Sequence, residues 1–127
     1  MKDFLLSWGF VFFAALFDSY AAFIVKTQFN KLGKIDFSSI KSVLKYIYVF
    51  VQNPILLTAL ITFFAAPALW FIALNRLDLS VAYPVLVGFH LVFVLIFGIV
   101  FLSEGMTVNK GIGCALVLLS LYFFYKK

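Results

Sequence analysis

The sequence predicts an all-α membrane protein with four transmembrane helices and an amphipathic interfacial helix between the first and the second. Of its 127 residues, 65% are hydrophobic and 12% are charged, whereas soluble domains average about 45–50% and about 25%. The apolar residues gather in four runs, and one membrane span needs about 20 of them in succession. Polar residues are left only for short loops and tails, so we expect residues 1–127 to form a single transmembrane domain.

The same composition excludes several other classes of protein. A chain with 18 Phe residues is not a disordered tail. Its single cysteine, Cys114, cannot form an intrachain disulfide, which excludes a disulfide-stapled secreted domain. The net charge of +5 comes from Lys residues near the predicted membrane edges, which indicates contact with lipid headgroups rather than with nucleic acid. We therefore expect the lipid bilayer, and no nucleic acid, among the partners.

The first apolar run covers residues 4–25 and is bracketed by Lys2 and Lys26. It is long enough to cross the hydrocarbon. It also exceeds the apolar region of a signal peptide, about 7–15 residues, and contains an internal acid. We predict a span here rather than a cleaved leader, followed by a polar linker over residues 27–36.

Three further apolar runs follow, at residues 54–74, 81–102 and 111–125. The second span begins with Asn53 and Pro54, a helix cap followed by proline at the first helical position. Ser80 is the expected N-cap of the third. The fourth is short for a bilayer at about 1.5 Å per residue.

Residues 37–51 have the spacing of an amphipathic helix. The apolar positions recur three and four residues apart, while serines and lysines occupy the other face. We expect this helix to lie in the headgroup plane, with Lys41 and Lys45 toward anionic lipid. The alternative interpretation is that it extends the second membrane helix beyond the bilayer.

Asp18 is the strongest candidate for a functional residue. It precedes Lys26 by about 12 Å of helix and so lies inside the hydrocarbon. Intramembrane carboxylates are costly, and they usually face a cavity or another helix on an ion or substrate pathway. We predict that Asp18 alternates between holding a proton and holding a cation. The structural alternative is a permanently protonated Asp that only bonds a neighbouring helix.

His90 is predicted near mid-bilayer as well, where it could relay protons or pair with Asp18. A neutral imidazole that bonds between helices is the competing interpretation. With no second His or Cys nearby we expect no metal site. The sequence contains no nucleophile with a base and no phosphate-binding loop, so we expect neither an enzyme nor a cofactor.

Two segments carry a resemblance to a known superfamily. They are residues 73–84, ALNRLDLSVAYP, and residues 101–113, FLSEGMTVNKGIG. In order and spacing they resemble the drug/metabolite transporter superfamily, EamA-like proteins included. The resemblance covers roughly residues 54–125 and reaches the first span through the pair Asp18 and Lys26.

Within that superfamily, the four-helix length resembles the small multidrug resistance (SMR) transporters. The resemblance implies a dimer, commonly antiparallel, that exchanges protons for cationic substrates at a carboxylate of the first helix. Asp18 falls where that family carries its essential glutamate, with Lys26 at the matching distance. Tyr83 matches a tyrosine of the binding chamber. Gly113 and Ser120 match the small-residue dimer seam, with Ser120 in place of the usual Gly.

The sequence also departs from the SMR pattern. Leu86 stands where the chamber tryptophan is expected, and the acid is Asp rather than Glu. Residues 82–86 and Glu104 look more like the subunits proposed to flip undecaprenyl-phosphate-linked aminoarabinose, which generally lack the first-helix acid. The segment of residues 30–52 belongs to neither pattern.

These observations together predict a small multi-pass transporter of the bacterial inner membrane that works as a dimer by alternating access. We expect proton-coupled export of small cationic or amphipathic compounds, with Asp18, Tyr83 and His90 as the substrate and proton site. The partner chain is a second copy or a similar four-helix chain. The alternatives are a flippase subunit for a lipid-linked sugar and a non-transporting scaffold subunit.

Overall fold

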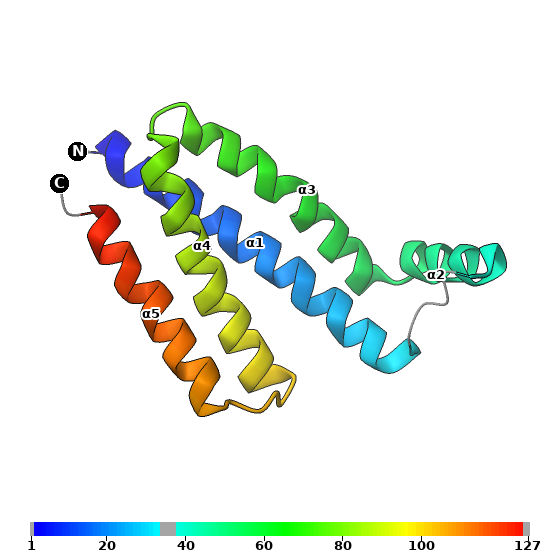
Figure 1. Ribbon diagram of the computed structural model, residues 1–127. Coiled ribbons are helices and arrows are strands. Elements are labelled where there is room, and N and C mark those ends of the chain that lie inside the picture. The colour runs from blue at the N-terminus through cyan, green and yellow to red at the C-terminus, as the bar shows by residue number, and fades with distance from the viewer. Residues whose placement is uncertain (1, 34–37, 126–127) are drawn as a thin grey trace.

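The computed structural model describes residues 2–33 and 38–125, and every regular element within them is a helix (Figure 1). The elements are α1 (Lys2–Leu32), α2 (Ile40–Gln52), α3 (Pro54–Leu74), α4 (Leu79–Ile96), the π-helix η1 (Phe97–Phe101) and α5 (Val108–Tyr125). The predicted all-α class is therefore confirmed. The predicted start of the amphipathic helix, Phe37, lies outside the described residues.

Three helical stretches are long and apolar enough to cross a membrane. They are Leu5–Leu32, Pro54–Leu74 and Leu79–Phe101, while Val108–Phe124 is apolar but shorter. The 18 residues of α5 correspond to about 27 Å of helix, slightly less than the hydrocarbon core of about 30 Å. The fourth span stays a prediction.

The first helix is longer than the sequence analysis predicts. A polar linker is expected from Thr27, but α1 continues to Leu32. The Thr27 hydroxyl donates to the Phe23 carbonyl at 2.9 Å, so it is satisfied inside the helix. The helix ends only at Gly33, whose φ of +84° lies in the left-handed region that favours glycine.

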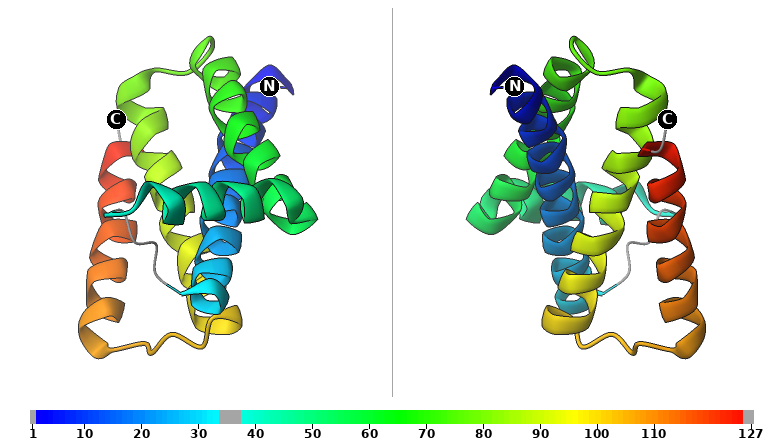
Figure 2. Two further views of the ribbon diagram at one scale, coloured as in Figure 1. Left: turned by 90° about the vertical axis from the view of Figure 1, so that its right-hand side faces the viewer. Right: turned by 90° about the vertical axis from the view of Figure 1, so that its left-hand side faces the viewer.

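The second helix is a separate element and not an extension of α3, so the alternative interpretation of this segment is wrong. Asn53 has an extended backbone between the two helices, and its side chain accepts hydrogen bonds from Ile55 N (2.9 Å) and Leu56 N (3.4 Å). An extended conformation is favoured before Pro54, which starts α3. Figure 2 shows α2 crossing the direction of the other helices.

The packing of the bundle centres on α1, which contacts α3 and α4, while α5 packs on α4. Small side chains of α1 carry this contact. One buried cluster joins Val11, Ala14, Ala15, Ala73 and Leu86, and another joins Ala21, Ile24, Leu56 and Ala59. Small residues let helix backbones approach closely, which is how helices associate in a membrane.

The contact between α4 and α5 depends on Gly88, which is buried against the side chain of Leu121. A Cβ at this position would overlap the Leu121 δ-methyl group. The opposite face of α5 is exposed and apolar, with Leu116, Leu119 and Phe123 among its residues. This face is available to lipid or to another helix.

Candidate functional site

The structure brings Asp18 and His90 together. Asp18 lies in the middle of α1 and His90 in the middle of α4, and His90 Nε2 is 3.2 Å from Asp18 Oδ2. The Nε2 atom is buried, yet it makes no hydrogen bond within the described part of the chain, because its direction to the carboxylate is not that of a hydrogen bond. The predicted pairing of two mid-span polar residues is thus present as a contact at ion-pair distance.

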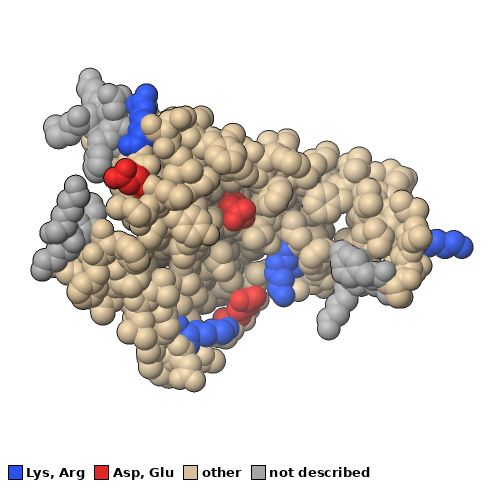
Figure 3. All heavy atoms as spheres, turned by 45° about the horizontal axis from the view of Figure 1, so that its top comes forward, with Lys and Arg blue, Asp and Glu red and all other residues tan. Residues whose placement is uncertain are grey.

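Asp18 is less enclosed than its mid-span position predicts. Its side chain is 47% exposed in the single chain, against 29% for that of His90. Figure 3 shows one face of the molecule, on which acidic and basic side chains are few and most of the surface belongs to other residues. A carboxylate in such a place would face lipid unless another chain or a ligand covers it.

Two cavities adjoin Asp18, and residues of α1 and α3 line both of them. Cavity A, of about 160 Å³, is lined by Ala14, Asp18, Ala66, Pro67, Trp70, Leu86 and His90. Leu86 occupies the position where the SMR resemblance predicts a chamber tryptophan. The Leu86 side chain lines cavity A. Pro67 also lines it, as expected from a proline that interrupts the helical hydrogen bonds of its span.

Cavity B is larger, about 450 Å³, and its walls are apolar except at Asp18. Ala21, Ala22, Val25, Phe50, Ala59, Leu60 and Phe63 complete its lining. Phe50 comes from α2, so the amphipathic segment contributes to the space beside the carboxylate. A cavity with one acid and apolar walls fits an amphipathic cation. The carboxylate can bind the positive charge of such a ligand, and the apolar walls can bind its apolar surface.

The hydroxyl groups of α3 are mostly satisfied by their own helix. Thr58 donates to the Ile55 carbonyl at 2.6 Å, and Thr62 reaches the carbonyls of Thr58 and Ala59 at 3.0 Å each. Tyr20 of α1 lies 3.1 Å from the Thr58 hydroxyl and links the two helices. Thr58 therefore contacts α1 through Tyr20, two residues after Asp18.

Tyr83 is not part of either cavity wall. It is 55% exposed and packs edge-on against Trp70, with ring centroids 6.1 Å apart. Trp70 lines cavity A, so Tyr83 contacts a residue of the cavity wall rather than the cavity itself. Sequence alone does not single out Trp70, because its position near a helix end is also that of an interfacial anchor.

The predicted seam residues Gly113 and Ser120 lie on α5, on an element that contacts α4 rather than α1. Both are exposed, and a Cβ built at Gly113 would meet no atom within 4 Å. Ser120 donates to the Val117 carbonyl at 2.7 Å. These residues are separate from the Asp18 site. Within the described residues, no group of three His, Cys, Asp or Glu could hold a metal ion.

Comparison with known proteins identifies the family of this chain. The sequence model of the Small Multidrug Resistance protein matches residues 35–119, which is more than half of the chain. The chain belongs to the small multidrug resistance family. No curated protein and no solved structure matches it.

Membership in the SMR family agrees with the apolar helices. Members are transporters rather than enzymes, and they work in a membrane on small molecules. The protein is accordingly a multi-pass membrane protein. The matched region begins at residue 35, so it leaves α1 outside and includes α2. The expectation that residues 30–52 lie outside the SMR pattern is therefore wrong for residues 35–52.

Proposed function

We propose that this SMR protein is a proton-coupled exporter of small cationic or amphipathic compounds that works as a dimer in the bacterial inner membrane. The observation that carries the proposal is the mid-span contact between Asp18 and His90 beside two cavities. Family membership supports transport, and the geometry supports Asp18 as the residue that binds the transported charge.

The chemistry follows from competition for one carboxylate. An ionised Asp18 attracts either a proton or an organic cation, and binding of one displaces the other. His90, 3.2 Å away, can stabilise the ionised carboxylate when it is itself protonated and can carry a proton to or from it. Apolar walls around cavity B favour cations with an apolar body.

The half-exposed carboxylate supports a dimer. In a single chain, Asp18 would present a charged group to lipid, which is costly. A second copy, or a similar four-helix chain, would cover this face and complete the chamber, and rocking of one half against the other would expose the site to each side in turn. We assign Gly113 and Ser120 to the dimer seam and Tyr83 to the chamber as its outer aromatic residue.

We assign α2 to the membrane surface. Its exposed apolar side chains include Ile40, Leu44, Ile47 and Val51, while lysines occupy other positions of the helix. A helix of this kind buries its apolar face at the boundary of headgroups and acyl chains. Its direction across the bundle in Figure 2 supports this orientation.

The test is substrate-induced proton release from the purified, reconstituted protein, compared with Asp18→Asn from acidic to alkaline pH. A tetraalkylammonium ion and a planar aromatic cation serve as probes. We expect release from the wild type and none from Asp18→Asn, because the amide cannot exchange a proton. Asp78→Asn is the matched control, since Asp78 caps α4 without a side-chain cap bond and should keep release unchanged.

Two outcomes would contradict the proposal. Release that persists in Asp18→Asn would remove Asp18 from the coupling step. No release with either cation, from protein shown to be folded, would remove the export of soluble cations and favour the lipid-linked sugar or the scaffold role.

A further inference from the structure

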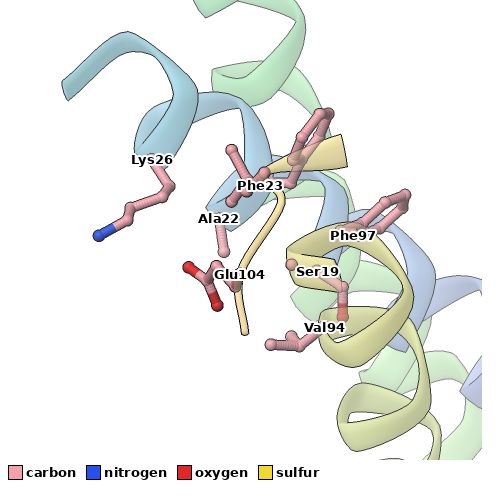
Figure 4. A pocket seen from close by; sticks show the side chains of 9 residues that line it. Ser19, Ala22, Phe23, Lys26, Val94, Phe97 and Glu104 are labelled. Carbon is pink, nitrogen blue, oxygen red and sulfur yellow. The ribbon is translucent and has the colours of Figure 1, made fainter. Parts of the chain in front are cut away.

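A third cavity lies on another side of α1, against α4 and η1, and the proposed transport site does not use it. Cavity C has a volume of about 170 Å³. Figure 4 shows its side chains converging from α1, from α4 and η1, and from the loop that follows η1. Its wall between the helices is apolar and includes Phe23, Val94 and Phe97.

The mouth of cavity C carries opposite charges. Lys26 of α1 and Glu104 of the loop after η1 both line it, and both are exposed. No ion pair joins these two side chains in the described structure. A second cation lies close by, because Lys110 Nζ donates to the carbonyl of Gly105, the residue after Glu104, at 3.1 Å. The mouth thus has one cation and one carboxylate that do not neutralise each other by direct contact, and Lys110 lies beside the loop that carries the carboxylate.

The deep end of cavity C contains an unpartnered hydroxyl. Ser19 lines the cavity, is 2% exposed, and its Oγ has no hydrogen-bond partner in the part of the chain that is described. A serine in a helix usually bonds a carbonyl of the preceding turn, and a buried hydroxyl without a partner is destabilising. A ligand that enters the cavity with an oxygen acceptor would satisfy this group.

The backbone holds Glu104 over the cavity. Its N–H donates to the Gly98 carbonyl of η1 at 2.9 Å, and the preceding Ser103 has a φ of +53°. Because Gly98 has no side chain, the Glu104 carboxylate can lie against η1, with Oε2 3.0 Å from the place where a Cβ would be. π-Helical turns and left-handed non-glycine residues occur at functional sites more often than elsewhere.

We propose that cavity C binds a zwitterionic phospholipid whose headgroup has a phosphate and a primary ammonium group. Lys26, with Lys110 nearby, attracts the phosphate, and Glu104 accepts hydrogen bonds from the ammonium group. Ser19 lies about 10 Å deeper along α1 than Lys26, where its hydroxyl donates to a glycerol ester oxygen. The acyl chains then follow the apolar wall.

The depth of Ser19 is the reason for assigning a lipid rather than a soluble zwitterion. A free phosphoethanolamine molecule can satisfy the charges at the mouth, but it has no ester oxygen that reaches the buried hydroxyl. Lys26 also marks the predicted edge of the hydrocarbon, where a phospholipid places its phosphate. Lipid binding in cavity C requires neither Asp18 nor transport.

The test is lipid binding to the delipidated full-length protein in detergent, measured by native mass spectrometry. Phosphatidylethanolamine, phosphatidylcholine and phosphatidylglycerol with the same acyl chains are compared, together with soluble phosphoethanolamine. We expect phosphatidylethanolamine to bind about tenfold more tightly than the other two lipids, because its ammonium group is the only charged hydrogen-bond donor among the three headgroups and so makes the strongest hydrogen bonds to Glu104. Soluble phosphoethanolamine should bind far more weakly.

Three variants separate the roles of the polar groups. Glu104→Gln should remove the preference for the ethanolamine headgroup. Lys26→Gln should lower the affinity for all three lipids by the same factor. Ser19→Ala should weaken lipid binding while leaving the lipid-free protein as stable as the wild type or more stable, since it deletes an unsatisfied group. Lys41→Gln and Asp78→Asn change the same charges elsewhere on the surface and should bind like the wild type.

Equal binding of the three lipids by the wild type would overturn the proposal. So would wild-type binding in both Lys26→Gln and Glu104→Gln. Phosphoethanolamine that binds as tightly as the intact lipid would overturn the assignment to a phospholipid.

Discussion

The His90 imidazole lies 3.2 Å from the Asp18 carboxylate, but no hydrogen bond is aligned between them. The contact joins α1 to α4 and leaves one edge of the carboxylate open to the cavities. A fully bonded pair would hold both side chains in one arrangement, whereas no hydrogen bond fixes the direction of the imidazole toward the carboxylate here. The geometry therefore suits a site that changes its partner.

A double-mutant cycle should detect this contact. We expect the losses in unfolding free energy for Asp18→Asn and His90→Gln to be non-additive, with a coupling of about 0.5–3 kcal/mol. Unfolding in detergent, followed by circular dichroism, gives the four values. A cycle with Asp78→Asn in place of Asp18→Asn should be additive. Additive effects in both cycles would show that the two side chains do not interact.

Tyr46 should hold α2 against the end of α1. Its hydroxyl donates to the Gly33 carbonyl at 2.8 Å, with the Leu32 carbonyl 3.4 Å away. We expect Tyr46→Phe to lower the free energy of unfolding by about 1 kcal/mol and to increase hydrogen exchange at the end of α1. Tyr48→Phe is the control, because Tyr48 is 63% exposed. Equal effects of both variants would contradict the role of Tyr46.

The orientation of α2 can be measured with spin labels. In a Cys114→Ala background, labels at Leu44 and Ile47 should be accessible to oxygen dissolved in the bilayer, because these apolar positions face the acyl chains. Labels at Lys41 and Lys45 should be accessible to a water-soluble nickel chelate. Accessibility is read from electron paramagnetic resonance saturation. Equal chelate accessibility at all four positions would place this helix outside the membrane.

The proposed seam on α5 predicts a selective effect on association. Gly113 has open space around it, so Gly113→Leu should leave the single chain folded and weaken the dimer about tenfold or more by preventing close approach. The dimer fraction is measured by light scattering in detergent over a range of concentrations. Gly9→Leu is matched, since Gly9 also lies in open space but on α1. A dimer that is equally stable in both variants would place the seam elsewhere.

The differences between expectation and structure have local causes. The first part of the expected linker, from Thr27, is helical to Leu32 because its polar residues are tolerated in a helix and no breaker occurs before Gly33. Tyr83 does not line cavity A but packs on Trp70, which does, and sequence spacing does not show which ring reaches the site.

The sequence by itself determined the membrane class, the positions of the apolar helices and the choice of Asp18 and His90. These properties are local, because the length of an apolar run and the cost of a polar side chain in hydrocarbon depend only on neighbouring residues. The tertiary structure decided the crossing of α2, the formation of cavities A to C, and the placement of Ser19, Lys26 and Glu104 around one cavity. They depend on how small residues such as Ala14 and Gly88 let the helices approach and rotate against one another, and this packing involves residues far apart in the chain.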